Sequence, residues 1–563
     1  MTFLAPRRFS CFCASLPILI VLSFGSALAQ KYLNSVVVSD HEWATQAGME
    51  ILEQGGNAVD SAVATAFALA VVDPASSGLG GGGFMVLYEA KEKKAHVLDF
   101  VEVSPAATQR EIYEEDGRFQ PQRLVTGGKA VAVPGTVGGL VEALKRFGSL
   151  PLGTVMAPAI RYAESGFPVT ARLQHAVEEN RATLNENASF RRIFAQKDGR
   201  LYGVGERIRQ PELAESLKRI AQLGVAGFYE GRIGQAIVAS IKAAGGVLDL
   251  DDLRSYKPVW RQPVIGNYRG TLVVTVPPPS SAGIALVEML NVLEGYALRQ
   301  FPHNSATYLH VIAETEKAAL ADQRTYAGDP GFTTIPVQRL TSKRYAASLR
   351  KEISTALARP VDAQQIPSHS SASGGTNHLG VLDGDGNVVA MGLTINDPFG
   401  AKILVREVGI ILNNSMARFA IPTHVKRTTN GRVANGLKPR KRPASTMTPV
   451  ILLKGDEPVL VVGASGGSRV TSAVLQTILN VVDFEMPLKK ALRAERAHVE
   501  RGGSLIALEN GMDGAIATGL EDKGHTVYRS DASGVVQAIH VDGPTIFVQS
   551  DPRLEEPAAG NRP

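Results

Sequence analysis

Cysteine is almost absent from this chain of 563 residues, and its two copies, Cys11 and Cys13, both fall within the first 29 residues. Those 29 residues are typical of a secretory signal peptide, because two arginines precede an apolar run at 16–24 and Ala-Leu-Ala at 27–29 supplies a cleavage site. A mature chain that begins at Gln30 would have neither disulfides nor thiol chemistry. Its stability must then come from packing.

Long hydrophobic runs are also missing after residue 29, since no later stretch is long and apolar enough to span a bilayer. We therefore expect an exported protein, periplasmic or secreted, without a membrane anchor. The pair Arg7-Arg8 leaves open whether export follows the general or the twin-arginine route.

The chain has little excess charge of either sign. Its net charge is +5, and removal of Arg7 and Arg8 leaves +3, which is too small for the whole chain to bind a polyanion. Residues 426–442 contain seven Lys or Arg and no acid, so this segment would form an electropositive loop that favours acidic substrates. Export and the lack of interleaved aromatic residues argue against nucleic-acid binding.

The order of predicted elements changes along the chain. Up to about residue 359 the apolar spacing is mostly helical, with strands at 95–100 and 271–276. The predicted helices cover 44–72, 138–147, 212–223, 233–244, 283–293 and 306–324. The later part is rich in strands, predicted at 408–412, 450–453, 459–462, 504–508, 535–541 and 545–549, with a helix at 468–482. Sheets layered with helices, an α+β fold, fit this order best.

A β-hairpin is predicted around the turn at residues 383–386, Asp-Gly-Asp-Gly. Pairing about Asp385 places Thr376 directly opposite Thr394, so that two hydroxyl groups lie side by side. The even positions form a small, polar face and the odd positions an almost wholly apolar one. We expect the apolar face to be core and the polar face to be a candidate site.

Thr376 follows a segment, 367–375, that has the composition of an accessible loop, where chains are most easily cut. A cut before Thr376 would expose an α-amino group, whose reference pKa of roughly 8 allows it to take the proton from the threonine hydroxyl. An N-terminal threonine therefore carries nucleophile and base on one residue. The alternative is a plain Ser/Gly connection into an ordinary hairpin.

Other local patterns argue against cofactors. The glycine-rich segment 78–83 lacks the Gly-Lys-Ser/Thr ending of a phosphate-binding loop and predicts close backbone approach instead. The turn at 383–394 begins like a calcium loop, but it has Val388 where glycine is needed and Thr394 where glutamate is needed. The eleven histidines show no ligand spacing, so we predict no metal and no cofactor.

Ser465 is the rival nucleophile, since Gly463-Ala464-Ser465-Gly466-Gly467 follows an apolar strand and precedes a helix, as in a nucleophile elbow. A serine esterase of this kind would need a downstream acid and histidine, chosen from Asp513, Asp522, His525 and His540. In the other interpretation, Gly466 and Gly467 present backbone N–H groups to a developing oxyanion.

Several segments together resemble the γ-glutamyltransferase (γ-glutamyltranspeptidase, glutathione hydrolase) family of N-terminal-nucleophile hydrolases. The resemblance spans nearly the whole mature chain, and the matching blocks stand in family order. They are 55–84 (GGNAVDSAVATAFALAVVDPASSGLGGGGF), 132–136 (AVPGT), 374–378 (GGTNH), 409–414 (GIILNN), 442–447 (RPASTM), 466–469 (GGSR) and 550–553 (SDPR).

The resemblance implies a precursor that cleaves itself between Gly375 and Thr376. Its products would be a large subunit, 30–375, and a small catalytic subunit, 376–563, intertwined in a four-layer αββα sandwich. By the same resemblance Thr376 would be the nucleophile, Thr394 would hydrogen-bond its hydroxyl, and Gly466 with Gly467 would form the oxyanion hole. Asn396, Ser445 and Thr446 would hold the α-carboxylate of a γ-glutamyl amide, and the acyl group would pass to water or to an amine acceptor.

Three departures from the family pattern concern the glutamyl head group. The block Asp-Phe-Arg-Glu reads Asp-Phe-Val-Glu here, with Val101 in place of the arginine that pairs with the α-carboxylate. The Gln or Glu and the Asp that bind the α-amino group are replaced by Ser415 and Arg418. Since Arg418 would repel an ammonium group and attract a carboxylate, we hypothesise a substrate without a free α-amino group. Glutaryl amides and internal units of poly-γ-glutamate are the candidates.

Three functions therefore stay open from the sequence: a self-processing threonine amidohydrolase or transferase, an esterase that uses Ser465, and an uncleaved binding protein without activity. The acceptor, the balance of transfer over hydrolysis and the oligomeric state do not follow from the sequence.

Overall fold

The computed structural model describes residues 1–2, 30–32, 35–360, 375–420, 433–500, 503, 505–531, 534–554 and 559–560. Most of the predicted signal peptide, the loop 367–374 before the expected cut and half of the basic segment 426–442 lie outside the described residues.

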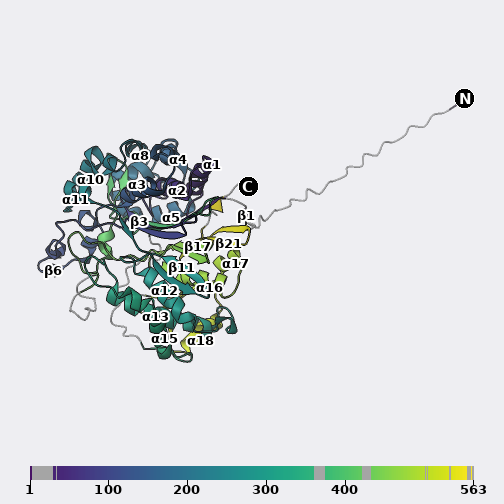
Figure 1. The fold of residues 1–563 in the computed structure, drawn as a ribbon. Helices are drawn as coiled ribbons and strands as arrows, with labels where there is room; N and C mark the ends of the chain where they lie inside the picture. The colour runs from purple at the N-terminus through teal and green to yellow at the C-terminus, as the bar shows by residue number, and fades with distance from the viewer. Residues whose placement is uncertain are drawn as a thin grey trace.

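Two seven-stranded antiparallel sheets form the middle of the molecule (Figure 1). Sheet A consists, in spatial order, of β1 (Gln30–Tyr32), β22 (Thr545–Ser550), β21 (Val535–Asp542), β17 (Glu457–Ser465), β16 (Val450–Lys454), β11 (Thr271–Thr275) and β10 (Val264–Tyr268). Sheet B consists of β23 (Ala559–Gly560), β2 (Val36–Ser39), β12 (Gly375–Leu382), β13 (Val388–Asn396), β3 (Gly82–Glu89), β4 (Lys94–Asp99) and β9 (Val259–Arg261).

Helices cover the outer face of each sheet, so the fold has four layers. The first helical layer packs on sheet B and contains α1 (Glu42–Glu53), α2 (Ala58–Val72), α3 (Thr136–Phe147), α4 (Leu152–Ser165), α8 (Pro211–Leu223) and α10 (Gly231–Ala243). The second packs on sheet A and contains α12 (Ala282–Leu293), α13 (Ala306–Tyr326), α16 (Val470–Val482) and α17 (Leu488–Arg493). Figure 1 shows these two layers above and below the sheets. The predicted αββα sandwich is confirmed.

The remaining elements are shorter. The helices are α5 (Ala171–Glu179), α6 (Arg181–Glu186), α7 (Ala188–Phe194), α9 (Val225–Tyr229), α11 (Leu250–Ser255), α14 (Val337–Leu340), α15 (Lys343–Glu352) and α18 (Gly514–Glu521). The strands are β5 (Glu114–Glu115), β6 (Arg118–Phe119), β7 (Phe167–Pro168), β8 (Arg207–Ile208), β14 (Leu404–Val405), β15 (Ile410–Ile411), β18 (Ala497–Val499), β19 (Leu505–Glu509) and β20 (Thr526–Ser530).

The two sides of the expected cut contribute strands to both sheets. In sheet B, β12 pairs with β2 and β13 pairs with β3. In sheet A, β16 pairs with β11 and β22 pairs with β1. The parts before and after Thr376 are therefore joined by strand hydrogen bonds along both sheets.

Most predicted elements lie within two or three residues of the observed ones, with two corrections. The pattern at 44–72 predicts one helix, but the helix is interrupted at Gly55-Gly56 and a second helix begins after Asn57. Asn57 accepts from the N–H of Asp60, whose carboxylate accepts from the N–H of Asn57, so a capping box restarts the helix. The strand predicted at 408–412 shrinks to the two residues of β15.

The hairpin register is confirmed, but the expectation that the polar face as a whole is a candidate site, and not core, is corrected. Thr376 pairs with Thr394, and Asp383 accepts hydrogen bonds from the backbone of Asp385 and Asn387 in the turn. The odd positions pack under the first helical layer, as expected. The even positions face sheet A, where a Cβ on Gly380 would lie 3.4 Å from Val461. Both faces are therefore core, and a site can form only where the strands end.

No helix among the described residues has the length and apolar character needed to cross a membrane.

Candidate active site

Thr376 lies at the beginning of β12, where the hairpin has an irregularity. The pairing shifts between Gly375 and Thr376, so Gly375 pairs with Asn396 while Thr376 pairs with Thr394. A bulge of this kind re-aims side chains at the end of a strand. Thr376 is nearly buried, with 7% of its surface exposed.

The Thr394 hydroxyl connects the two residues of the expected cut. Thr376 Oγ1 donates to Thr394 Oγ1 at 3.2 Å, and Thr394 Oγ1 donates to the carbonyl oxygen of Gly375 at 2.5 Å. The N–H of Asn396 donates to the same Thr394 oxygen at 2.8 Å. Thr394 therefore holds the nucleophile candidate and the carbonyl next to it in one hydrogen-bonded chain.

A buried polar network that the sequence did not predict contacts Thr376 and Asn377 at the beginning of β12. Asn377 Nδ2 donates to Asp40 at 3.0 Å and to Asp73 at 2.7 Å, and Arg172 lies 3.7 Å and 3.6 Å from the same two carboxylates. Arg172 Nη2 also donates to the carbonyl oxygen of Thr376 at 3.4 Å. Burial raises the pKa of Asp40 to about 6, although Arg172 opposes this rise. The sequence indicated this network only by an acid after each of two apolar elements, Asp40 after β2 and Asp73 after α2.

Gly466 and Gly467 form the tight turn between β17 and α16, with φ of 130° and 61°. Both values lie in the region that favours glycine. Among the described residues neither N–H donates a hydrogen bond, so both are available to an oxyanion. Thr446 Oγ1 donates to the carbonyl of Gly467 at 3.2 Å, which connects the 445–446 loop to this turn. The same loop packs on β13, because a Cβ on Gly392 would lie 3.3 Å from Met447.

The residues expected to hold an α-carboxylate surround the same end of β13. Asn396 continues this strand beyond Thr394, and its Nδ2 donates to Asn414 Oδ1 at 3.0 Å. Ser445 is buried, and its Oγ accepts from the N–H of Met447 at 3.2 Å. Thr446 is half-buried beside it. Ser445 and Thr446 thus lie on one loop that contacts both β13 and the Gly466-Gly467 turn.

Arg418 and Glu102 form an ion pair beside Asn396. Arg418 Nε donates to Asn396 Oδ1 at 3.0 Å, and its Nη1 lies 3.5 Å from Glu102 Oε2. Burial raises the pKa of Glu102, and Arg418 and the hydroxyl of Ser415 act against that rise. Among the described residues neither oxygen of Glu102 accepts a hydrogen bond from a side chain or backbone donor of good geometry, and Arg418 Nη1 donates none. The pair is therefore poorly satisfied by the protein itself.

Val101, at the position where the family pattern has an arginine, brings no charge to this cluster. It is fully buried between the sheets, and the guanidinium of a different residue, Arg442, donates to its carbonyl oxygen. Arg442 also pairs with Asp99 at 3.4 Å. The cation next to Asp99 and Val101 is therefore Arg442 of the 442–447 segment, and its guanidinium is already bound to these two residues.

The geometry gives no support to a serine triad at Ser465. Ser465 ends β17 with 2% of its surface exposed, and no hydrogen bond joins it to a histidine in the part of the chain that the structure describes. His540 lies within β21, and His525 bonds to His310. Asp513 and Asp522 cap the two ends of α18.

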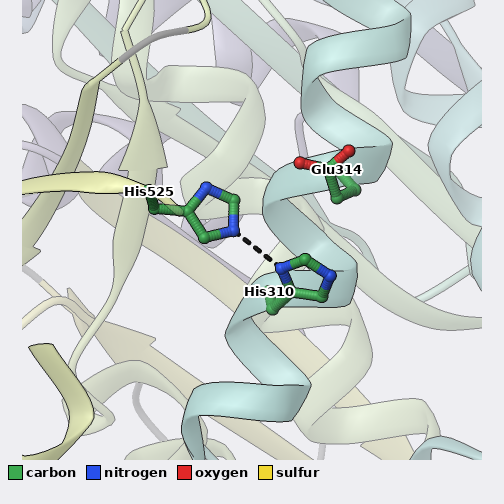
Figure 2. A group of neighbouring side chains, drawn as sticks. All are labelled: His310, Glu314 and His525. Atoms are coloured by element: carbon green, nitrogen blue, oxygen red, sulfur yellow. Dashed lines mark hydrogen bonds between the residues drawn. The ribbon is translucent and has the colours of Figure 1, made fainter. Parts of the chain in front are cut away.

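His310, Glu314 and His525 come together although their spacing did not indicate a site (Figure 2). His310 Nε2 donates to the carbonyl of Ser354 at 2.7 Å, so its Nδ1 must accept from His525 Nε2, also at 2.7 Å. His525 Nδ1 is then left to accept from Lys317 at 3.3 Å. Figure 2 shows Glu314 on the same helix as His310, and the Glu314 carboxylate pairs with Lys317 at 2.7 Å. Every nitrogen is used, so the cluster does not require a metal ion.

A family model described as Gamma-glutamyltranspeptidase matches residues 44–561. The chain belongs to this family. It is 38% identical over 526 residues to the glutathione hydrolase proenzyme of Escherichia coli (strain K12), with 92% of this chain and 90% of that protein covered. It is 37% identical over 502 residues to the Acylase ACY 1 proenzyme of Pseudomonas sp. (strain SE83), with 88% and 87% covered. The solved cephalosporin acylase from Bacillus halodurans matches with a TM-score of 0.81 at 29% identity, with 98% of each chain covered.

Membership in the gamma-glutamyltranspeptidase family makes the protein an enzyme and a hydrolase of the self-processing type, and it disfavours the esterase and the inactive binding protein. The relatives named as glutathione hydrolases and those named as acylases are about equally similar to it. Sequence identity alone therefore does not decide which acyl group the enzyme takes.

Proposed function

We propose that this gamma-glutamyltranspeptidase-family enzyme uses Thr376 as its nucleophile, after cutting its own chain between Gly375 and Thr376. The observation that supports this most strongly is the Thr394 hydroxyl, which bonds to both the Thr376 hydroxyl and the Gly375 carbonyl. We also propose export to the periplasm or the medium, with residues 1–29 removed.

Self-cleavage would begin with attack of Thr376 Oγ1 on the carbonyl carbon of Gly375. The Gly375–Thr376 amide bond would break, giving an ester on the threonine oxygen and a free amine on Thr376. The Thr394 hydroxyl donates to the oxygen on which negative charge develops, which lowers the barrier. Water would then hydrolyse the ester, leaving a carboxylate on Gly375 and an N-terminal threonine.

Turnover would use the same oxygen. The new α-amine takes the hydroxyl proton, Thr376 attacks the substrate amide, and the amine component leaves with that proton. Gly466 and Gly467 would stabilise the oxyanion, and Asn396 with Ser445 and Thr446 would bind a carboxylate of the acyl group. Water or an amine acceptor then removes the acyl group from Thr376.

The acyl group would be acidic and would lack a free α-ammonium. Ser415 and Arg418 take the positions expected to face the head group, and Arg418 Nη1 has no hydrogen-bond acceptor among the described residues. A second carboxylate or an amidated nitrogen suits this cation, because Arg binds carboxylates in charge-assisted hydrogen bonds. Glutaryl amides and internal poly-γ-glutamyl units have this chemistry.

The nucleophile is tested by the intact mass and N-terminal sequence of the exported protein under denaturing conditions. We expect two chains, one of which starts at Thr376, and we expect Thr376→Ala to remain uncut and inactive. Ser465→Ala should be cut and active. An uncut wild-type chain, or an active Thr376→Ala variant, would refute the assignment.

The acyl preference is tested by comparing kcat/KM for glutaryl-p-nitroanilide and γ-glutamyl-p-nitroanilide. We expect the glutaryl compound to be the better substrate. A strong preference for the γ-glutamyl compound would reject the proposed role of Arg418 and leave the nucleophile assignment unaffected.

A further inference from the structure

Glu288 of α12 is a buried acid outside the active site, and no ion pair with a described basic residue neutralises it. Its residue is 1% exposed, and both carboxylate oxygens lack a hydrogen-bond donor among the described residues. No ion pair within 4.0 Å joins Glu288 or Asp322 to Lys or Arg in the described part of the chain, although the charge of Arg339 acts on both carboxyl groups from further away. A buried, unpaired carboxylate is costly, so something must compensate for it.

The group that faces Glu288 is another acid, Asp322 of α13. Both residues line the same cavity, and burial followed by the charge of Asp322 raises the pKa of Glu288 to about 9, although Arg339 opposes this rise. Tyr345 of α15 donates to Asp322 at 2.7 Å, and Arg339 of α14 stacks on the Tyr345 ring. Because ionised carboxylates only accept hydrogen bonds, two of them can be held together only by a shared proton or by a cation.

A narrow cavity, of which the centres of water-sized molecules can occupy about 20 Å³, lies against this pair. Glu288 and Asp322 form part of its wall, together with apolar side chains such as Ile284 and Leu340 and the ring of Tyr326. This volume exceeds the roughly 10–15 Å³ that one water needs, so the cavity has room for a very small molecule. Ser280 and Ser281 also line it, and Ser281 donates to the carbonyl of Ser445, so the cavity adjoins the loop that we place in the active site.

We propose that this cavity binds a small primary ammonium ion, which replaces the proton shared by Glu288 and Asp322. The three N–H donors of an alkylammonium match two carboxylates and one further oxygen, and its methyl or methylene group suits the apolar wall. A divalent metal ion would need six or more oxygen ligands, which these walls do not supply. The displaced proton leaves to solvent, so each ammonium bound at neutral pH releases about one proton.

The probe is methylammonium chloride, titrated into the exported, cleaved enzyme by calorimetry at pH 7 in two buffers of different ionisation enthalpy. We expect saturable binding with release of about one proton, read from the difference in heat between the buffers. Potassium chloride at the same concentration should give no such signal. Tetramethylammonium, which is too large and has no N–H, should also fail to bind.

Glu288→Gln should lose the binding, whereas Glu521→Gln, at an exposed position of α18, should keep it. The proton release by the wild type needs no variant, so the test stands even if Glu288→Gln folds poorly. Absence of binding, binding without proton release, an equal response to potassium, or unchanged binding by a folded Glu288→Gln would each overturn the proposal.

Discussion

Thr376 and Thr394 face each other across two neighbouring strands, with their hydroxyl oxygens 3.2 Å apart. Because the hydroxyl of Thr394 also donates to the carbonyl of Gly375, it acts on the bond before Thr376 in the uncut chain. In the proposed mechanism the same hydroxyl lies beside the nucleophile afterwards, so one residue would serve the single cleavage event and every later turnover.

Thr394→Ala should slow self-cleavage by roughly 100-fold to 1,000-fold, as expected for loss of one donor to a developing oxyanion. A time course of denaturing gels after synthesis measures this rate directly. Thr394→Ser keeps the hydroxyl and should cleave at a rate near that of the wild type. Thr183→Ala, at an exposed position, is the control, and cleavage of Thr394→Ala at the wild-type rate would contradict the role of the hydroxyl.

Arg172→Met should raise the pH at which the enzyme becomes active. Arg172 bonds to the carbonyl of Thr376 and pairs with Asp40 and Asp73. Its positive charge lowers the pKa of a nearby amine, and its loss leaves two acids that raise that pKa. The acidic limb of the pH profile of kcat/KM should therefore move to higher pH. Arg172→Lys keeps the positive charge, so its acidic limb should move less than that of Arg172→Met. Arg161→Met, on the surface, should not move the limb. If the acidic limb of Arg172→Met does not move, the role of Arg172 is purely structural.

Arg418→Asp should change the ratio of kcat/KM for γ-glutamyl over glutaryl anilides by about 10-fold or more in favour of the γ-glutamyl compound, since 1.4 kcal/mol corresponds to a factor of ten. The new carboxylate would attract the α-ammonium that Arg418 repels. Arg406→Asp makes the same charge change at an exposed position on the same segment and should leave the ratio unchanged. An equal shift in both variants would mean that overall charge, and not contact with the head group, sets the preference.

The contribution of His378 to the stability of the fold should fall as the pH drops from 7 to 5. Burial lowers the pKa of His378 from its usual value of about 6.5 to about 3. The unfolded chain therefore binds more protons than the folded chain between these two values, and stability present at neutral pH is lost on acidification. His378 alone accounts for about 2 kcal/mol between pH 7 and pH 5.

His378→Leu should make acidification from pH 7 to pH 5 less destabilising, so that the Tm at pH 5 relative to pH 7 is higher than in the parent, measured on the uncut Thr376→Ala chain so that one polypeptide unfolds. His175→Leu removes an exposed histidine and should leave the fall unchanged. An equal dependence on pH in the wild-type and His378→Leu backgrounds would place the acid sensitivity in other buried groups.

The sequence predicted the parts of the site that are close in the chain. The turn around Asp385 determines the hairpin register, and the register alone places Thr376 opposite Thr394. The alternation of residues shows which side chains share a face, but it does not show what covers that face, so the burial of Gly380 against sheet A was missed.

Contacts between remote segments depend on the order of strands and helices, which local patterns do not encode. Asn377 meets Asp73 and Asp40 across 304 and 337 residues, and His310 meets His525 across 215. The face-to-face acids Glu288 and Asp322 likewise follow from the packing of α12 on α13. Each of these groups looks like an ordinary polar residue in its own segment.

The bond proposed for cleavage lies at the beginning of β12, which pairs with β13 on one side and, further along, with β2 from the part before the cut on the other. The reactive amine can be produced only after these strands have found each other, because Thr394 meets Gly375 nowhere else. A precursor that misfolds after export would stay chemically inert, and it would not become a stray acyltransferase. A covalent titration of N-terminal threonine would therefore count the molecules that have folded. The amount of titrated active site would then equal the amount of correctly assembled protein.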